Sequence, residues 1–119
     1  MSTDKEQNIQ LAAKIISDKK GDNIVGLDVS EVSSMTNHIL IAEGMIDRHV
    51  VAMAKTLQAE MKEAGNPPTR VEGVESGDWV VLDFVDLIVH IFTPQMRELF
   101  QLEKLFQSAK PLNLNLQNA

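Results

Sequence analysis

The side chains that could carry out chemistry in this sequence include three histidines, His38, His49 and His90. None has a second histidine four residues away, the spacing that puts two metal ligands on one helical face. Each is therefore expected to be a structural or surface residue. His49, which follows Arg48 at the start of an expected helix, is the best candidate for a functional contact, with a solvated first turn as the alternative.

Three aspartates stand where turns or loops are expected. Asp83 and Asp86 flank a tight turn three residues apart, and Asp28 ends a strand. Carboxylates that bind a metal need a third ligand and usually alternate along one strand face. Aspartates beside tight turns more commonly accept hydrogen bonds from their own backbone. We therefore predict turn and loop anchors here, and no metal site or cofactor.

Other catalytic patterns are missing from the sequence. The chain has no cysteine, which excludes disulfides, cysteine-based zinc sites and thiol catalysis. It has no Gly-x-Ser-x-Gly nucleophile elbow, and its six glycines are scattered rather than gathered into a phosphate-binding loop. We assign no catalytic residue. The sequence favours a binding module over an enzyme.

The composition is typical of one acidic globular domain. The chain has 119 residues, 44% hydrophobic and 24% charged, enough for one core. Its formal net charge is -6 and its longest basic run is Lys19-Lys20, so we expect no direct nucleic-acid binding and favour a basic protein partner. The polar N-terminus is no secretory signal, and no apolar run approaches the roughly 20 residues of a membrane span. We expect a cytoplasmic protein with no membrane partner.

The hydrophobic spacing predicts an α+β domain in the order α-β-β-α-β-β-β-α, with a mixed sheet of about five strands flanked by helices. A capping box of Thr3 and Glu6 should open the first helix, and Gly21 should end it in a left-handed conformation. The expected helices cover residues 3–20, 47–64 and 93 to about 108; the expected strands cover 23–29, 38–44, 69–74, 79–84 and 87–92. The second strand should lie well inside the sheet. The first two helices should each bury one apolar stripe, which contains Ile9 and Ile16 in the first helix and Leu57 and Met61 in the second.

These elements place the domain at residues 1–108, with residues 109–119 as a tail that is mobile or lies along a neighbouring surface. The last two strands form a tight hairpin around Val85-Asp86, although Val85 suits a positive φ poorly. Alternation puts Trp79 on one face with Val81 and Asp83. Trp79 is then either an interface anchor or a partly buried core residue, and both alternatives stay open.

The last helix carries more apolar surface than one buried face uses. At about 100° per residue, one stripe contains Leu99, Leu102, Leu105 and Phe106, while Met96 and Phe100 lie off it. The helix is either wedged between two parts of the chain or exposed to a partner. Phe100, ringed by Arg97, Glu103 and Lys104, favours the partner, since interfaces combine aromatic anchors with a polar rim. A homodimer would satisfy the same geometry.

Several fragments, in their order and spacing, resemble the ribosomal silencing factors, also called the Iojap-related family. They are LDVSEVSSMTNHILIAEG, Arg48-His49-Val50, VEGVESGDWVVLD, the IVH ending at His90, and Arg97 with the following LF-x-LEKL. The resemblance covers about residues 11–106. It implies a cytoplasmic, non-enzymatic protein that binds a β-barrel protein on the joining face of the large ribosomal subunit, the fourteenth in large-subunit numbering. Bound there, it would sterically block the small subunit and repress translation.

The resemblance also implies a fold related to nucleotidyltransferases. The alternative function is therefore a nucleotide-binding domain or enzyme that uses Asp28, Asp83 and Asp86, although the glycine-serine loop of such transferases is missing. The partner-binding residues carried over from the family are Trp79, Phe100, Leu102 and Glu103, with Asp83, His90 and Arg97 nearby. The chain departs from the family pattern at Asn37 (usually Asp), Val85 (Gly), Phe100 (Tyr) and Phe106 (Trp).

Overall fold

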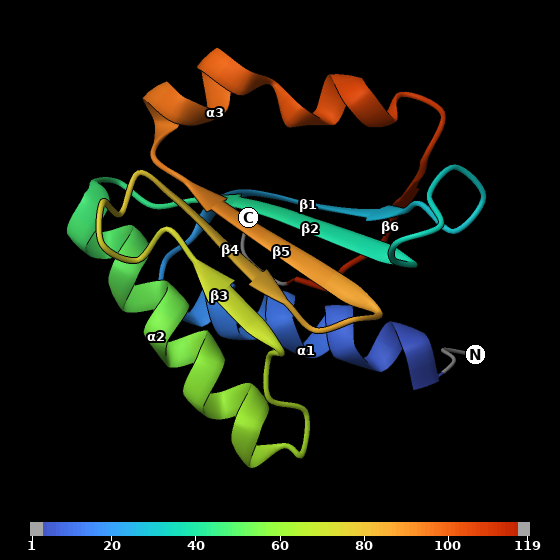
Figure 1. Cartoon of the computed structure of the whole chain (residues 1–119), viewed down its shortest axis with the longest axis horizontal. Helices are drawn as coiled ribbons and strands as arrows, with labels where there is room; N and C mark the ends of the chain where they lie inside the picture. The colour runs from blue at the N-terminus through green and yellow to red at the C-terminus, as the bar shows by residue number, and fades with distance from the viewer. Residues whose placement is uncertain (1–3, 117–119) are drawn as a thin grey trace.

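In a computed structural model, which describes residues 4–116 and the side chains of residues 6–116, the chain folds as the α+β domain that the sequence predicts. The expected eight elements appear in the expected order and are followed by a 3₁₀-helix, η1, and a further strand (Figure 1). Their bounds are α1 Asp4–Asp18, β1 Asp22–Asp28, β2 His38–Glu43, α2 Asp47–Glu63, β3 Arg70–Glu72, β4 Trp79–Asp83, β5 Leu87–Phe92, α3 Pro94–Phe100, η1 Leu102–Phe106 and β6 Lys110–Leu112.

The sheet is mixed and has six strands, one more than the five expected. Its strand order is β3-β4-β5-β2-β1-β6, in which β2 and β5 are parallel and all other neighbours antiparallel. The apolar strand β2 therefore lies inside the sheet, as predicted. Figure 1 shows α1 and α2 against one face of the sheet, and α3 with η1 across the other.

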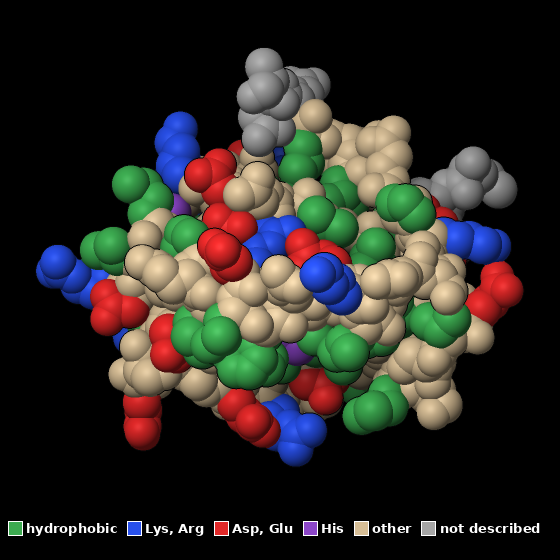
Figure 2. Space-filling model, turned by 90° about the horizontal axis from the view of Figure 1, so that it is seen from above, with side chains coloured by type: hydrophobic (Ala, Val, Ile, Leu, Met, Phe, Trp, Pro, Cys, Tyr) green, Lys and Arg blue, Asp and Glu red, His purple; other side chains and the backbone are tan. Residues whose placement is uncertain are grey.

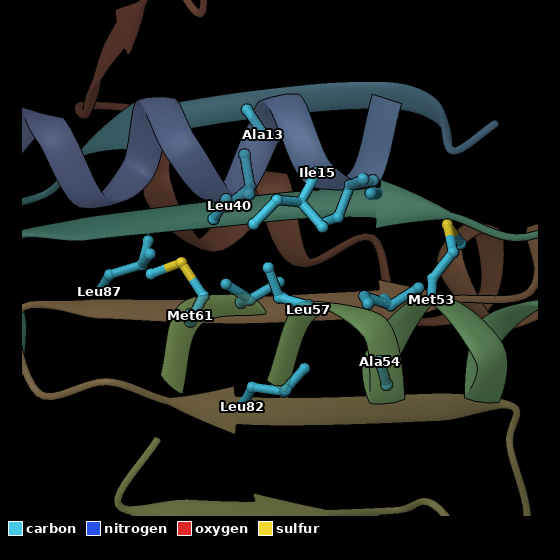
Figure 3. Packing of buried hydrophobic residues seen from close by; sticks show 14 of the residues in the cluster. Ala13, Ile15, Leu40, Met53, Ala54, Leu57, Met61, Leu82 and Leu87 are labelled. Carbon is cyan, nitrogen blue, oxygen red and sulfur yellow. The ribbon is translucent and has the colours of Figure 1, made fainter. Parts of the chain in front are cut away.

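The first of these faces, which we call the packed face, holds the main hydrophobic core. The apolar stripes predicted for the first two helices are confirmed: Ile9 and Ile16 of α1, and Leu57 and Met61 of α2, are fully buried. They pack against Leu40 and other apolar side chains of β2, β4 and β5 (Figure 3). Because each fully buried side chain of this size contributes about 1.5–3 kcal/mol, this face supplies most of the folding free energy.

The second face, which we call the open face, holds a smaller core. Leu27, Ile39, Ile41 and Phe92 are buried there, with Met96, Leu102 and Phe106 of α3 and η1 packed against them. This cover does not reach the whole sheet. Side chains of β4 and β5 on this face remain half-buried, among them Val81 and Ile88.

The last helix is not continuous, which corrects the expectation of one helix to about residue 108. α3 ends at Phe100, because Gln101 adopts a left-handed conformation with a φ of 46° and its N–H bonds the Arg97 carbonyl. Angles counted along one helix therefore do not apply beyond this point. Leu99 and Leu105, expected in the core stripe, are 72% and 73% exposed.

The expected helix boundaries are otherwise mostly confirmed. Thr3 of the predicted capping box lies outside the described residues. Gly65 ends α2 with a φ of 88°, as expected. The prediction for Gly21 is wrong: Lys20 takes the left-handed conformation, with a φ of 69°, while Gly21 allows a close approach, since a Cβ there would lie 2.4 Å from Cγ2 of Ile16. Thr93 precedes Pro94 at the start of α3, but its side chain forms no capping hydrogen bond.

The hairpin between β4 and β5 forms as predicted despite Val85. This residue has a φ of 75°, a left-handed conformation that β-branched side chains disfavour. The Val85 N–H donates to the Asp83 carboxylate over 2.8 Å. Asp83 is thus a turn anchor, as expected.

The segment after η1 lies along the sheet. Residues 110–112 form β6, which pairs with β1, and Leu114 is buried beneath Gly26 against the packed-face core. Of the two expectations for residues 109–119, mobility or contact with a neighbouring surface, the described part shows contact with β1. The boundary expected after residue 108 thus falls just before the last strand.

Candidate partner-binding surface

An aromatic contact joins the sheet to the end of α3. Trp79 lies opposite Phe92 in the β4–β5 ladder, and the two rings stack with centroids 5.0 Å apart. Its other neighbour is Phe100, the last residue of α3, at 4.6 Å. Phe92 is fully buried, Trp79 half-buried and Phe100 46% exposed. Trp79 therefore bridges the core and the surface.

Trp79 begins a half-buried band along the open face. Alternation puts Val81 beside it on β4, and Ile88 and His90 on the same face of β5. We call these four residues and Phe100 the open strip. Figure 2 looks down on this side of the molecule and shows hydrophobic side chains gathered around a histidine in its lower half. The strip is an apolar surface on rigid strands.

His90 is held by the tryptophan. The Trp79 indole Nε1–H donates to Nδ1 of His90 over 3.1 Å. Burial lowers the pKa of His90 to about 4. The imidazole is therefore neutral at neutral pH, as its role of acceptor requires.

Arg97 fastens α3 and η1 to the sheet. Its side chain is buried, with Nη2 at 2.7 Å from the Glu103 carboxylate and Nη1 at 3.3 Å from the Glu43 carboxylate. Nη1 also donates to the Asn23 carbonyl on β1. Burial raises the pKa of Glu103, but the hydrogen bond and the positive charge of Arg97 hold it below its usual value. Arg97 thus lies beneath the helix, unlike the exposed rim residue expected around Phe100.

The structure brings together only part of the set predicted from sequence. Trp79, His90 and Phe100 share the strip, whereas Leu102 packs into the open-face core. Arg97 and Glu103 form a separate ion cluster next to them. Asp83 shares the face of Trp79 but lies at the other end of β4, 4.0 Å from the Arg70 guanidinium.

Two of the other residues singled out for chemistry, His49 and Asp28, have bonding partners within the chain, whereas Nδ1 of His38 is buried without a hydrogen-bond partner among the described residues. His49 accepts the Met45 N–H at Nδ1, and its Nε2 lies 2.8 Å from the Lys19 carbonyl, so it ties α2 to the end of α1. Hydrogen bonds from Ser30 hold the pKa of Asp28 below its usual value, as expected of a loop anchor. Among the described side chains (residues 6–116), no three from His, Asp or Glu form a group that could hold a metal ion.

Some contributors to this surface were missed. Ile88 belongs to the strip, and strand alternation from His90 would have found it. Glu43 and Asn23 bind Arg97 from strands more than 50 residues earlier in the chain. No local sequence pattern signals contacts of that kind. In the described part of the chain, no helix is long and apolar enough to cross a membrane.

Comparisons with known proteins agree on one family. Residues 2–119 match the family model "Ribosomal silencing factor during starvation". "Ribosomal silencing factor RsfS" of Chromobacterium violaceum is 37% identical over 102 residues, which cover 86% of this chain and 84% of that protein. The mouse "Mitochondrial assembly of ribosomal large subunit protein 1" is 26% identical over 83% of this chain and 45% of its own length. A crystal structure from Chromobacterium violaceum superposes with a TM-score of 0.86 at 32% identity, covering 98% of this chain and 97% of that one.

Proposed function

The chain belongs to the ribosomal silencing factor family, and from that premise we propose that it binds the large ribosomal subunit and represses translation without catalysing a reaction. The partner is a protein on the joining face of that subunit, the fourteenth in its numbering. Bound there in the cytoplasm, the domain sterically blocks the small subunit. The names of the family and of the mouse relative support the ribosomal partner; the partner protein and the blocking mechanism rest on the resemblance.

The observation that carries this proposal is the open strip. Interfaces are anchored by aromatic side chains in rigid surroundings, and Trp79 is held between Phe92 and Phe100 before any partner arrives. A surface that is already ordered loses little conformational entropy on binding. The same sheet face is half covered by α3 and η1, so the uncovered half is available to a partner.

Charge narrows the kind of partner. Glu72 lies opposite Val81 in the β3–β4 ladder, and Asp83 follows on the same face, so carboxylates flank the strip. The chain as a whole carries a formal net charge of -6. A basic protein surface would be attracted to this face, and the attraction would weaken with salt. A nucleic-acid surface would be repelled.

The Arg97 cluster supports the strip from behind. It joins α3, η1, β1 and β2, and so fixes where α3 ends and where Phe100 points. Glu103, which is 38% exposed at its side chain, can still reach a partner. We propose Trp79 and Phe100 as anchors, Leu102, Arg97 and Glu103 as their support, and Asp83 and His90 as flanking contacts.

Co-sedimentation tests the proposal. The chain should pellet with free large subunits in preference to small subunits or assembled ribosomes. Trp79→Ala and Phe100→Ala should each weaken this binding at least tenfold, the loss of about 1.4 kcal/mol or more that anchors show. Leu99→Ala is the matched control, because Leu99 lies on the same helix, is 72% exposed and is outside the strip. Equal binding to all three particles would contradict the proposal.

Cross-linking from a position beside the strip identifies the partner. A photoreactive group at position 99 should label the fourteenth large-subunit protein, and the label should fall in the Trp79→Ala background. Light scattering of mixed subunits should show slower joining when the chain is present. A homodimer through the strip is the competing outcome, and it would appear as a dimer in solution that Phe100→Glu dissociates.

Nucleotide transfer is not proposed. Asp28 and Asp83 lie on β1 and β4, which β2 and β5 separate in the sheet. Each carboxylate accepts hydrogen bonds from its own loop. No observation therefore favours a nucleotide site over the binding surface.

A further inference from the structure

One directional bond crosses a surface that otherwise consists of apolar contacts. The indole N–H of Trp79 can only donate, so Nδ1 of His90 must be its unprotonated acceptor. A neutral imidazole with an unprotonated Nδ1 carries its hydrogen on Nε2. The tryptophan therefore fixes which tautomer of His90 is present.

The second ring nitrogen of His90 is available at the surface. Nε2 has no hydrogen-bond partner among the residues that the structure describes, and it is not among their fully buried, unpartnered polar atoms. It therefore reaches solvent within the open strip, between apolar neighbours on β4 and β5. It does so as an N–H group.

We propose that His90 positions Trp79 for partner binding and that its Nε2–H donates a hydrogen bond to an oxygen acceptor on the partner. This inference rests on the proposed function, since it concerns the same surface. It assigns His90 two distinct roles through its two ring nitrogens. Nδ1 acts within the chain, and Nε2 acts across the interface.

The positioning role follows from what the aromatic contacts leave free. Phe92 beneath Trp79 and Phe100 beside it restrict the plane of the indole. These contacts do not distinguish the two orientations of the indole that differ by a half-turn about χ2, because both present similar apolar surface. The bond to Nδ1 does distinguish them. It selects the orientation whose N–H points along the sheet towards His90.

The bond persists over the whole neutral range. The charged or titratable groups on the surrounding elements are Arg70 and Glu72 of β3, Asp83 of β4, His38 and Glu43 of β2, Arg97 and Glu98 of α3, and Glu103 and Lys104 of η1. Burial, rather than any of these charges, lowers the pKa of His90 to about 4. Below that pH both ring nitrogens carry hydrogens, the indole loses its acceptor and the bond breaks.

Fluorescence of the isolated protein tests the positioning role. Trp79 is the only tryptophan and the chain has no tyrosine, so the emission reports on this side chain alone. His90→Leu keeps apolar volume but removes the acceptor, whereas His90→Asn restores an acceptor oxygen near the place of Nδ1. Acrylamide should quench Trp79 at least twofold more strongly in the leucine variant, and near the wild-type level in the asparagine variant. Equal quenching in all three would overturn the positioning role.

A double-mutant cycle on large subunits tests whether the two residues act together. Trp79→Phe should weaken binding about tenfold, because it removes the bond to Nδ1. His90→Leu should weaken binding about fiftyfold, because it removes both that bond and the outward donor. The double variant should be little weaker than His90→Leu, whereas independent losses, multiplying to about five hundredfold, would overturn the coupling.

The outward donor is tested by His90→Asn, whose side chain is too short to reach the place of Nε2. This variant should bind large subunits about fivefold more weakly while its quenching stays at the wild-type level. Binding as tight as wild type would overturn the donor role. If the wild-type chain itself did not bind large subunits, the proposed function would fail, and the quenching series would still decide whether His90 holds Trp79.

Discussion

The two faces of the sheet are built from the same strands but differ in how completely helices cover them. On the packed face, α1 with 15 residues and α2 with 17 cover the strands, and the side chains between them are fully buried. On the open face, α3 has seven residues and ends at Gln101. The short cover leaves Trp79 and its neighbours half in water. How far the helices extend over each face thus separates the core from the candidate surface.

The difference teaches where mutations should affect folding and where they should affect binding. A packed-face side chain has neighbours on all sides, so its removal leaves a cavity. An open-strip side chain already has water on one side. Removing such a side chain should lower the free energy of unfolding less and weaken the affinity for a partner more. Each prediction below tests one part of this contrast.

The largest effect should come from the packed face. Leu57→Ala removes a fully buried side chain of α2 and should lower the free energy of unfolding by about 3–4 kcal/mol, from lost burial and the cavity left behind. Urea denaturation measures this change. Phe100→Ala should cost less than about 1.5 kcal/mol in the same assay, because Phe100 is half exposed. Similar losses for the two variants would erase the contrast between the faces.

A smaller loss of unfolding free energy should follow from removing the Arg97 ion pairs on the open face. Arg97→Met leaves the Glu43 and Glu103 carboxylates without their cation and should cost about 2–3 kcal/mol, below the full range for a buried pair because Glu103 is partly in water. Amide hydrogen exchange should quicken in η1 before it does in α2. Arg48→Met, at an exposed arginine, is the control and should change neither quantity. Unchanged exchange in η1 would show that Arg97 does not hold this cover.

Acid should weaken the fold through the open face. The pKa of His90 falls from 6.5 in the unfolded chain to about 4 in the folded chain, so the unfolded state takes up the proton first as the pH falls. The neutral His90 contributes its full stabilisation above pH 6.5, and this contribution is lost as the pH falls towards 4. The free energy of unfolding should be about 2 kcal/mol lower at pH 5 than at neutral pH. In urea titrations, the free energy of unfolding of the wild type should fall by about 2 kcal/mol more than that of His90→Leu between pH 7 and pH 5. Parallel pH profiles would contradict the assignment.

The smallest effect should be a gain at the end of the strip. Val85→Gly relieves a left-handed φ of 75° at an exposed turn and should stabilise the fold by about 1 kcal/mol, after the entropy that glycine adds to the unfolded chain. This corresponds to a rise in Tm of roughly 4 °C by calorimetry. Val32→Gly, at a loop position without positive φ, should lower Tm instead. A fall in Tm for Val85→Gly would indicate that its side chain packs usefully.

Periodicity predicted the packed face well, since each stripe there reflects one regular element. The helix stripes that contain Ile9 and Leu57 follow from spacing within a single element, and so does the alternation from Trp79 on the open face. The break at Gln101 could not be predicted in this way, because counting angles presupposes that the helix continues. The angular count along one continuous helix placed Leu99 and Leu105 in the core stripe, whereas both side chains are exposed in the structure.

The candidate surface was only partly predictable for a related reason. Trp79 and Phe100 were named from residue type and family resemblance, and alternation supplied Val81. The contacts that hold these residues in place join β4 to β5 and α3 to β1. They depend on strand register and sheet topology, which a short stretch of sequence does not reveal. The strand after η1 had an unused local signal, the leucines at positions 112, 114 and 116, which alternate with polar residues as strand residues do.

The short last strand has a consequence for how the protein is handled. β6 pairs with the last three residues of β1, Gly26, Leu27 and Asp28, and so covers backbone N–H and C=O groups that would otherwise be free. β6 itself contains Lys110 and Pro111, a charged residue and a residue without an N–H, which discourage a further strand from adding. A chain truncated after residue 108 would uncover Gly26, Leu27 and Asp28 as well and leave all seven residues of β1 as an edge. Such a truncation should self-associate through strand pairing, so the full C-terminus belongs in any expressed or tagged form of the protein.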